Sequence, residues 1–295
     1  MHDHPAAAVG VGISCSPGLC GLAREVRDLV DLYEVSPDLL CQETVVHGQV
    51  RLIPDEAMVH AVEAVVRDAP VVYHGLTLSI GSVAGWNDAY VDMLDGLFAR
   101  RAPVWHSEHL GFLYFDAPSG SPASTGIPLP MPFTDEAATL IADRIRRLQE
   151  RYRAPFLLEN TAYYLPELPA DPGWNEAVFL NEVARRSGCG LLLDLHNLYC
   201  NARNHGFSAE ALIEQLDLSS VAEVHLAGGV EHTGYLLDVH SRLVPEPVWR
   251  LFELVAARAP NLRAVIFELM EQALPSLPTP AVRDTLRQVR ALWRA

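Results

Sequence analysis

The sequence predicts a single (β/α)8 barrel, because apolar runs and amphipathic stretches alternate along it eight times. Its 295 residues suit such a barrel, which typically needs ~250 residues. Hydrophobic residues make up 49% of the chain, as expected for a well-packed globular protein. Ionisable residues follow several apolar runs directly, at the strand ends where barrels carry their active sites. We therefore expect one domain over residues 1–295, with a flexible N-terminus at residues 1–8.

The predicted strands are short apolar runs of the kind that is buried on both faces of a parallel sheet. Gly190–Asn197 shows this best, with three leucines before its first carboxylate. A doubly wound sheet is the alternative, but Gly10-Val-Gly12 lacks the third glycine of a dinucleotide-binding loop. In chain order we expect strands at Val9–Cys15, Asp31–Pro37, Val71–Leu78, Val104–Phe112, Phe156–Asn160, Gly190–Asn197, Val221–Ala227 and Ala264–Leu269.

Helices are expected between these strands. Pro54–Arg67 opens with Pro-Asp-Glu, whose fixed proline φ and negative charges favour a helix N-terminus. Thr134–Tyr152 opens with a threonine cap and continues with apolar residues at helical spacing. The insert Tyr114–Phe133 is irregular, and in a barrel it would be a long active-site loop. The other expected helices are Leu19–Val30, Asn87–Arg100, Asn175–Arg186, Ser208–Leu216, Pro247–Ala257 and Ala281–Arg294.

Charge and cysteine content exclude several classes of protein. Lys plus Arg 22 against Asp plus Glu 37 gives a net charge of −15. Nucleic acid and anionic membranes both bind basic surfaces, so neither is expected as a partner. The N-terminus has no basic segment and no long apolar core, so no signal peptide is expected, and no apolar stretch approaches membrane-spanning length. The five cysteines include no CxxC pair, so we expect reduced thiols in a cytoplasmic protein.

Ionisable and polar residues gather at the C-terminal ends of the predicted strands. Each alone is explained as a core histidine, a loop cap or an ion pair. In a barrel, however, these ends converge on one mouth, where the carboxylates would repel one another unless cations neutralised them. Lys and Arg are nearly absent there, so metal ions are the expected cations. The residues are Glu34, His74, His106, Glu108, His109, Glu159, Asn160, Asp194, His196, Asn197, His225, Asp238, His240 and Glu268.

The type and number of these residues restrict which metal ions the site could hold and how many. Imidazole and carboxylate ligands without thiolate suit iron, manganese or zinc in a reactive site. Four acidic groups and at least four histidines exceed the needs of one ion, so two or three ions are expected. Strand alternation places His106 and Glu108 on one face of their strand and His109 on the other, so either set could point inward.

Several motifs occur in a characteristic order: His74-Gly75, Ser107-Glu108-His109-Leu110, Leu158-Glu159-Asn160, Leu193-Asp194 with Asn197, Asn204-His205-Gly206, Val224-His225-Leu226-Ala227-Gly228, Asp238-Val239-His240 and Phe267-Glu268. In order and spacing they resemble the multinuclear non-haem iron-dependent oxidative enzymes, which include the methanobactin biosynthesis oxygenase. The resemblance covers the chain from Val11 to about Leu277. The ligand order is also similar to that of the wider xylose-isomerase-like barrels, including endonuclease IV.

The resemblance implies a ligand for each metal position. His74 and His109 would bind one outer ion, and Glu159 would bridge it to a central cluster. The implied ligands of the central cluster, which are also the implied catalytic residues, are Asp194, His225 and Glu268. We follow the resemblance in choosing His109 over the opposite face of its strand.

A third ion is implied at Asp238 and His240. Asn197 would help to hold it, where the endonuclease-type pattern has a histidine. The neighbouring His196 is unusual for the family and would be either an extra ligand or a partner that orients one. Departures from the family pattern at Glu34-Val-Ser-Pro-Asp38 and Met270-Glu271-Gln272 concern substrate specificity more than metal binding.

The resemblance also implies an activity. Members of the family use iron, as two or three Fe2+/Fe3+ ions, and O2 to oxidise ribosomally made precursor peptides, commonly at cysteine. One iron would hold the cysteine thiolate, and an iron-bound superoxide would take a hydrogen from its β-carbon. The alternative is a zinc- or manganese-dependent hydrolase or sugar isomerase on the same barrel. A DNA-repair role conflicts with the charge of −15, and a metal store would not need so elaborate a pocket.

A precursor-peptide substrate raises the question of how its leader segment is bound. The eight strand–helix units occupy Val9 to Arg294, which leaves no room for a leader-binding domain. The loop Gly120–Pro132 is too short to bind a leader alone but could order over a peptide. We therefore expect a heterodimer with a small companion protein that captures the precursor.

Overall fold

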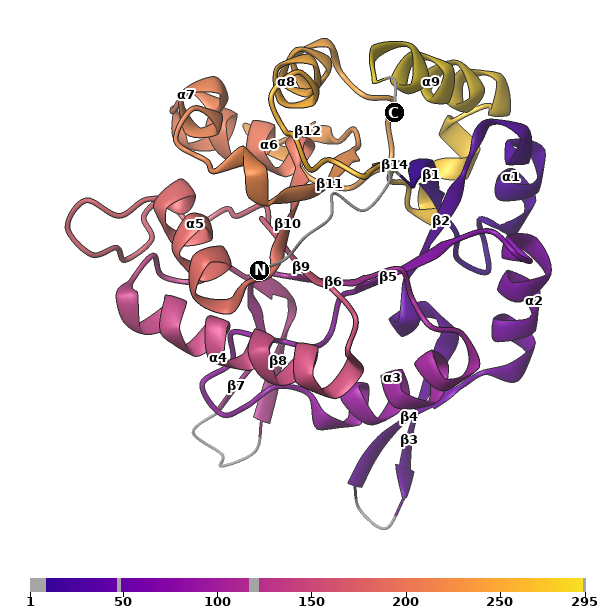
Figure 1. Ribbon diagram of the computed structural model, residues 1–295, viewed down its shortest axis with the longest axis horizontal. Helices are drawn as coiled ribbons and strands as arrows, with labels where there is room; N and C mark the ends of the chain where they lie inside the picture. The colour runs from indigo at the N-terminus through magenta and orange to yellow at the C-terminus, as the bar shows by residue number, and fades with distance from the viewer. Residues whose placement is uncertain (1–8, 47–48, 117–121, 294–295) are drawn as a thin grey trace.

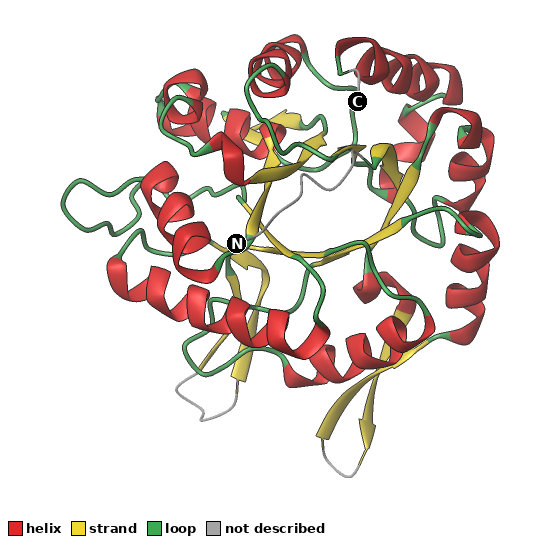
Figure 2. Cartoon of the chain, viewed as in Figure 1, coloured by secondary structure: helices red, strands yellow, loops and turns green. Residues whose placement is uncertain are grey.

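The computed structural model describes residues 9–46, 49–116 and 122–293 (Figure 1). Within them, eight parallel strands form a closed barrel in the order β1-β14-β11-β10-β9-β6-β5-β2. Helices surround the barrel (Figure 2), so the predicted (β/α)8 fold is confirmed. The barrel strands are β1 (Gly10–Ser14), β2 (Leu32–Val35), β5 (Val71–Gly75), β6 (His106–His109), β9 (Phe156–Glu159), β10 (Gly190–Asp194), β11 (Val221–Leu226) and β14 (Ala264–Phe267).

The helices follow the capping signals of the sequence. Thr134 caps its helix by accepting the N–H of Ala137 at 3.2 Å, as predicted. Among the described residues no helix is both long and apolar enough to span a membrane. The α-helices are α1 (Cys20–Glu25), α2 (Glu56–Val66), α3 (Asp88–Arg100), α4 (Asp135–Tyr152), α5 (Glu176–Ser187), α6 (Leu195–His205), α7 (Ala209–Ile213), α8 (Glu246–Ala256) and α9 (Thr279–Leu292), and the 3-10 turns are η1 (Arg27–Leu29), η2 (Pro37–Leu40), η3 (Leu218–Ser220) and η4 (Glu271–Ser276).

Helix α6 corrects the predicted strand Gly190–Asn197, which ends at Asp194. The Asp194 carboxylate accepts the backbone N–H of Asn197 at 2.6 Å and so caps the new helix. Gly206 ends the helix with a left-handed φ of 75°. Asp194 is therefore both the last residue of a barrel strand and the N-cap of the helix that follows.

Three antiparallel hairpins extend the barrel, and none was predicted. They pair β3 (Cys41–Val46) with β4 (Gln49–Pro54), β7 (Phe112–Asp116) with β8 (Pro122–Leu129), and β12 (Val230–His232) with β13 (Tyr235–Leu237). The expected irregular insert at residues 114–133 thus forms most of the β7–β8 hairpin. Residues 117–121 of that insert, and the expected flexible N-terminus at residues 1–8, lie outside the described residues. Figure 1 shows β3–β4 and β7–β8 projecting from the same side of the barrel.

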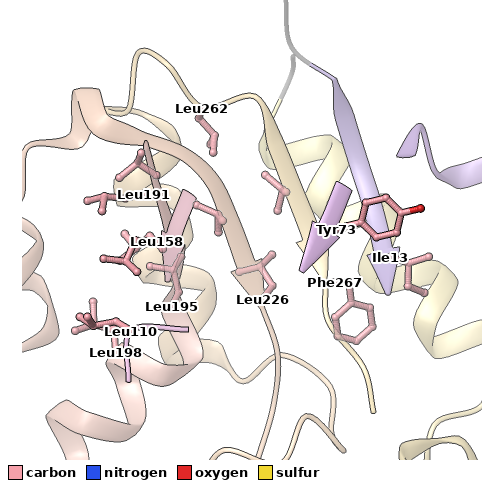
Figure 3. Close-up of a cluster of buried hydrophobic side chains, with 14 of the residues drawn as sticks. Ile13, Tyr73, Leu110, Leu158, Leu191, Leu195, Leu198, Leu226, Leu262 and Phe267 are labelled. Carbon is pink, nitrogen blue, oxygen red and sulfur yellow. The ribbon is translucent and has the colours of Figure 1, made fainter. Parts of the chain in front are cut away.

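Apolar side chains form two separate cores. A shell between barrel and helices contains the outward-facing strand residues, and Figure 3 shows Leu158 and Leu226 in it beside Leu195 and Leu198 of α6. The second core lies inside the barrel. We call its large side chains the apolar layer, which consists of Leu32, Val72, Trp105, Leu157, Leu192 and Ile266.

A polar layer lies two residues further along the same six strands. Side chains alternate between the two faces of a strand, so a step of two keeps them inside the barrel. The polar layer consists of Glu34, His74, Ser107, Glu159, Asp194 and Glu268, joined by His225 of β11. It lies toward the C-terminal ends of the strands, where the predicted site residues were expected.

Candidate metal centre

The first candidate ligand group joins β5, β6 and β9. Glu159 Oε2 lies 3.3 Å from His74 Nε2 and 3.1 Å from His109 Nε2. His109 donates its Nδ1–H to the Gly75 carbonyl at 3.1 Å, so its Nε2 carries a lone pair. Ser107 Oγ donates to the Tyr73 carbonyl and so accepts the Nδ1–H of His74 at 3.0 Å. Two imidazole lone pairs therefore face a carboxylate oxygen, an arrangement that a metal ion would satisfy.

The central group is buried and contains Glu159, Asp194, His225 and Glu268. His225 Nδ1 is 2.8 Å from Glu268 Oε2, 3.8 Å from Glu159 Oε1 and 3.9 Å from Asp194 Oδ2. Glu159 belongs to this group and to the first one, so it is placed to bridge two ions. The structure thus brings together Asp194, His225 and Glu268, the three residues that the resemblance implies as central.

A third group lies on the other side of Glu268. Asp238 Oδ1 is 2.7 Å from His196 Nδ1 and 2.7 Å from His240 Nε2. His240 also connects back to the central group, because its Nδ1 lies 3.2 Å from Glu268 Oε1. The three groups therefore form one continuous chain of carboxylates and imidazoles across the barrel mouth.

Two open questions from the sequence receive a geometric answer. In the third group His196 lies beside Asp238, whereas Asn197 donates its amide to the Asn160 carbonyl at 3.1 Å and to Glu159 at 3.4 Å. Asn197 as a metal ligand stays a prediction. On β6, His109 points into the barrel. His106 instead packs outward against Phe98 of α3, Tyr152 of α4 and Phe156 of β9, and its Nε2 lies 2.8 Å from Glu108 Oε1.

Glu34 and Glu223 form a fourth candidate group with His225. Sequence reasoning named Glu34 as a strand-end residue without making it a ligand, and it missed Glu223. His225 Nε2 lies 2.7 Å from Glu34 Oε2 and 4.0 Å from Glu223 Oε1. Trp105 Nε1 donates to the other Glu223 oxygen at 2.7 Å. Glu223 lies inside β11 rather than at its end, and its position two residues before His225 was the only sign that both face inward.

Burial dominates the electrostatics of these groups. Burial raises the pKa of Glu159 well above its ordinary value and raises that of Asp194 to about 6. Burial alone would lower the pKa of His225, but Glu34 and Glu268 raise it well above its usual range. A raised pKa means that His225 keeps its proton to higher pH, as do the Glu159 and Asp194 carboxyl groups, so bound protons reduce the negative charge of the central group. The chain contains no lysine, and in its described part the ion pairs of these carboxylates are all to histidine.

The donor atoms left over fit metal ions. His74 Nε2, Glu159 Oε2 and Asp194 Oδ2 are buried and have no hydrogen-bond partner in the described chain. An unpaired buried polar atom is costly, and such atoms on neighbouring imidazole and carboxylate groups are typical of ligands. Imidazole and carboxylate donors suit iron, manganese or zinc. These observations support more than one ion, because neighbouring groups share Glu159 and are linked through Glu268 and His240.

Solved structures share this architecture. The crystal structure of D-psicose 3-epimerase in the presence of D-fructose has a TM-score of 0.58, with 10% identity over 97% of this chain and 99% of that chain. A xylose isomerase domain protein from Alicyclobacillus acidocaldarius has a TM-score of 0.52, with 17% identity over 97% and 98%. At these identities the likeness shows the fold alone, a TIM barrel.

Comparison with known sequences is more specific than comparison of folds. A UPF0276 protein from Anaeromyxobacter sp. strain Fw109-5 is 40% identical over 205 residues, which cover 69% of this chain and 70% of that protein. The family model of the RiPP precursor modification enzymes MbnB/TglH/ChrH matches residues 11–293, nearly the whole chain. Enzymes of this family act on the precursors of ribosomally synthesised and post-translationally modified peptides (RiPPs). The chain therefore belongs to the MbnB/TglH/ChrH family of RiPP precursor modification enzymes.

Proposed function

We propose that this chain is a multinuclear iron-dependent enzyme that uses O2 to oxidise a precursor peptide at a cysteine residue. The observation that carries the proposal is the row of three ligand groups linked across the barrel mouth. One ion would leave most of these donors unused. Family membership supports the peptide substrate. The choice of iron rests on the donor set and on the sequence resemblance.

The proposed metal ligands fall into the three groups described above, according to their position in the barrel. Iron held there would supply redox chemistry with O2 and would bind the substrate thiolate, which is a soft ligand. We propose Asp194, His225 and Glu268 as the residues closest to the reacting atoms. The full proposed ligand set is His74, His109, Glu159, Asp194, His196, Asn197, His225, Asp238, His240 and Glu268.

The surrounding side chains would fix the ligands before any substrate binds. Glu34 accepts the Nε2–H of His225, which leaves Nδ1 directed at the central group. Ser107 and the Gly75 carbonyl select the tautomers of His74 and His109 in the same way. Most of these groups are fully buried, so the protein would exclude water from all but the substrate side.

A turnover experiment tests the proposal. Protein purified without oxygen and loaded with Fe2+ would be mixed with the precursor peptide and O2, and the peptide mass would be followed by mass spectrometry. A peptide with cysteine replaced by serine is the matched control. We expect an O2-dependent mass change only in the cysteine peptide. Turnover with zinc or manganese alone and without O2 would instead favour the hydrolase or isomerase alternative.

A companion protein forms the second part of this proposal. Hairpins β3–β4 and β7–β8 expose large apolar side chains, which are typical of interaction surfaces. The exposed fractions are 65% for Val45, 50% for Val50, 50% for Ile53, 43% for Phe115 and 55% for Ile127. Pull-down from the native host, followed by leader-peptide binding with and without the captured partner, tests this. Tight leader binding by the isolated barrel would contradict it.

A further inference from the structure

A cavity of about 590 Å3 lies between hairpins β3–β4 and β7–β8, which project from the same side of the barrel (Figure 1). Glu43 and Leu52 line it from the first hairpin, and Tyr114 and Ser124 line it from the second. The segment between β5 and α3 completes its lining. Volumes of this size are typical of ligand sites. We call this cavity the hairpin cleft.

The first wall of the hairpin cleft is one face of the β3–β4 hairpin. Strand pairing places Glu43 opposite Leu52 and Val45 opposite Val50, and directly opposed residues project from the same face. Glu43, Val50 and Leu52 line the cleft, so Val45 faces the same side. Val45 and Val50 are 65% and 50% exposed. The wall is therefore mostly apolar and open to a ligand, which is typical of an interaction surface.

The second wall is fixed against the segment that follows β5. Ser79 Oγ accepts the backbone N–H of Leu113 at 2.7 Å and that of Tyr114 at 3.3 Å. Ser82 Oγ donates to the Tyr114 carbonyl. Ser79 itself has a left-handed φ of 55°, which is uncommon for a residue with a side chain. Because these contacts hold the hairpin in place before a ligand arrives, binding would need little reordering of the chain.

Carboxylates surround the hairpin cleft. Asp38, Glu43 and Asp88 line it, and Glu43 is exposed and has no ion pair within the described residues. Burial raises the pKa of Asp38 to about 6, so Asp38 is still mainly ionised at pH 7. Burial also raises the pKa of the Tyr114 hydroxyl, and the charges of Glu43 and Asp38 raise it further. Both carboxylates therefore act on the same part of the cleft, which favours a ligand with a basic side chain.

Trp86 brings one cation of the chain itself to the edge of the cleft. Its Nε1–H donates to Asp88 at 2.8 Å, and the guanidinium of Arg147 lies 4.5 Å from its ring centroid. One face of the Trp86 ring is thus already covered, so a ligand would contact the apolar and carboxylate surfaces instead. Even with Arg147 counted, three carboxylates border the cleft against one guanidinium.

The hairpin cleft lies close to the metal centre along the chain. Asp38 follows Glu34 by four residues, and Thr77 follows His74 by three. The Cα atoms of these pairs are therefore at most ~14 Å and ~11 Å apart. An extended peptide covers such a distance in about four residues. A peptide bound in the cleft is consequently long enough to place a residue about four positions away at the barrel mouth.

We propose that the hairpin cleft binds the segment of the precursor peptide that flanks the modified cysteine, with apolar side chains against the two hairpins and a basic side chain beside Glu43. The proposal rests on the peptide-modifying function proposed above. Apolar contact would supply most of the affinity, because an ion pair with an exposed carboxylate contributes little. The charges would instead select which segments bind. The companion protein would hold the leader, so the cleft needs only weak affinity.

A binding experiment tests the cleft without turnover. The full chain as purified, kept without O2, would be titrated with N-acetyl-Val-Lys-Val-Val amide and with the same peptide carrying glutamate in place of lysine. Fluorescence of Trp86, assigned with Trp86→Phe, reports occupancy. We expect saturable binding of the lysine peptide and at least about fivefold weaker binding of the glutamate peptide. Equal affinity for the two peptides, or binding of neither, overturns the proposal.

Substitution of Glu43 tests the charge. Glu43→Gln should weaken binding of the lysine peptide about two- to fivefold, and Glu43→Lys should narrow the difference between the two peptides. Glu253→Gln, at an exposed position of α8, makes the same charge change elsewhere and should bind both peptides as the parent does. An unchanged preference for the lysine peptide in Glu43→Lys contradicts the proposed position of the basic side chain.

Filling the cleft tests its location. Ala84 is exposed and lines the cleft, so Ala84→Trp occupies the cavity without disturbing the core. Calorimetry should show no binding of the lysine peptide to this variant. Ala211→Trp, also at an exposed position, fills a separate cavity beside α7 and should bind as the parent does. Full binding by Ala84→Trp, or an equal loss in Ala211→Trp, overturns the proposal.

Turnover separates the peptide from other occupants of the cleft. Ala84→Trp should raise KM for the precursor about fivefold or more at unchanged kcat, and it should still capture the companion protein. Loss of the companion, or of a dimer of this chain, at unchanged KM would assign the cleft to that occupant and overturn the proposal. Binding of the lysine peptide without oxidation of the precursor would remove the proposed function but not the cleft. Oxidation with parental KM in Ala84→Trp would remove the cleft alone.

Discussion

The apolar layer and the polar layer inside the barrel are equally buried and chemically opposite. Leu32 and Val72 are 0% exposed, while Glu34 and His74, two residues further along, are 2% and 1% exposed. The same strands with the same alternation thus place leucine and valine in one layer and carboxylates and imidazoles in the next. Burial is therefore not what distinguishes the core from the candidate site.

The difference between the layers lies in what each side chain needs from its neighbours. Apolar side chains gain free energy from burial by themselves. Buried carboxylates gain it only when cations or donors compensate them, and desolvation otherwise costs several kcal/mol per ion. The apolar layer should therefore stabilise the fold, and the polar layer should be stable only with protons or metal ions bound. The predictions below test this division.

The largest effect is expected from removing a central ligand. His225→Ala or Glu268→Ala should abolish activity and metal binding, exceeding the ~10–100-fold loss that follows from removing an orienting partner. Asp194→Ala should do the same but also remove the cap of α6, so Asp194→Asn, which keeps a capping oxygen, is its control. Metal analysis and far-UV circular dichroism check the outcome. A folded variant with full metal content and turnover would show that the ligands are misassigned.

Truncation in the apolar layer should have the opposite signature. Leu157→Ala or Leu192→Ala leaves a cavity inside the barrel and should lower the free energy of unfolding by ~2–5 kcal/mol. The folded fraction should still bind the parent number of metal ions. Urea unfolding measures the first quantity and elemental analysis the second. Leu165→Ala, at a side chain that is 47% exposed, serves as control and should change stability by less than ~0.5 kcal/mol. Loss of metal ions without a change in the free energy of unfolding would contradict the proposed distinction between the two layers.

Glu34→Gln should have an intermediate effect, because Glu34 contacts His225 on the side away from the central group. The loss of its charge should weaken metal binding by ~10–100-fold while leaving the number of ions unchanged. Competition with a chelator of known affinity measures this change. Unaltered affinity would mean that His225 is held by its strand alone.

The smallest effect concerns Glu176, a carboxyl buried without other carboxylates around it. Burial raises its pKa to about 8, so the folded protein keeps this proton to higher pH than the unfolded chain does. Its stabilising contribution is complete below the ordinary pKa near 4.5 and is lost as the pH rises through about 8. Relative to Glu176→Gln, the parent should lose ~1.4 kcal/mol of stability per pH unit in that window. If the free energy of unfolding depends on pH in the same way for the parent and for Glu176→Gln, the prediction is contradicted.

The barrel could be predicted from the sequence because each strand is a short apolar run followed by polar residues. Helix α6 was missed because the leucines of β10 continue into Leu195, and the carboxylate between them marks both a strand end and a helix cap. The hairpins were missed because their alternation is weak and their apolar side chains, such as Val45, point to solvent.

The candidate site was predictable where a residue ended a strand and unpredictable where direction mattered. Glu159 and Asp194 end β9 and β10, so their convergence followed from the fold alone. His196 and Asn197 are adjacent on α6, and a rotation of ~100° per residue decides which one faces Asp238. That rotation depends on where the helix begins, which the sequence did not reveal. Glu223 escaped notice because it is surrounded by apolar strand residues.

The central claim is that the polar layer holds more than one metal ion and that iron supports activity. Protein purified without oxygen, with elemental analysis and Mössbauer spectroscopy on the same sample, tests it most directly. We predict two or three iron ions per chain and an iron-dependent rise in melting temperature over the metal-free protein. A single zinc ion per chain, with iron loading that yields neither additional bound ions nor O2-dependent chemistry, would contradict the claim.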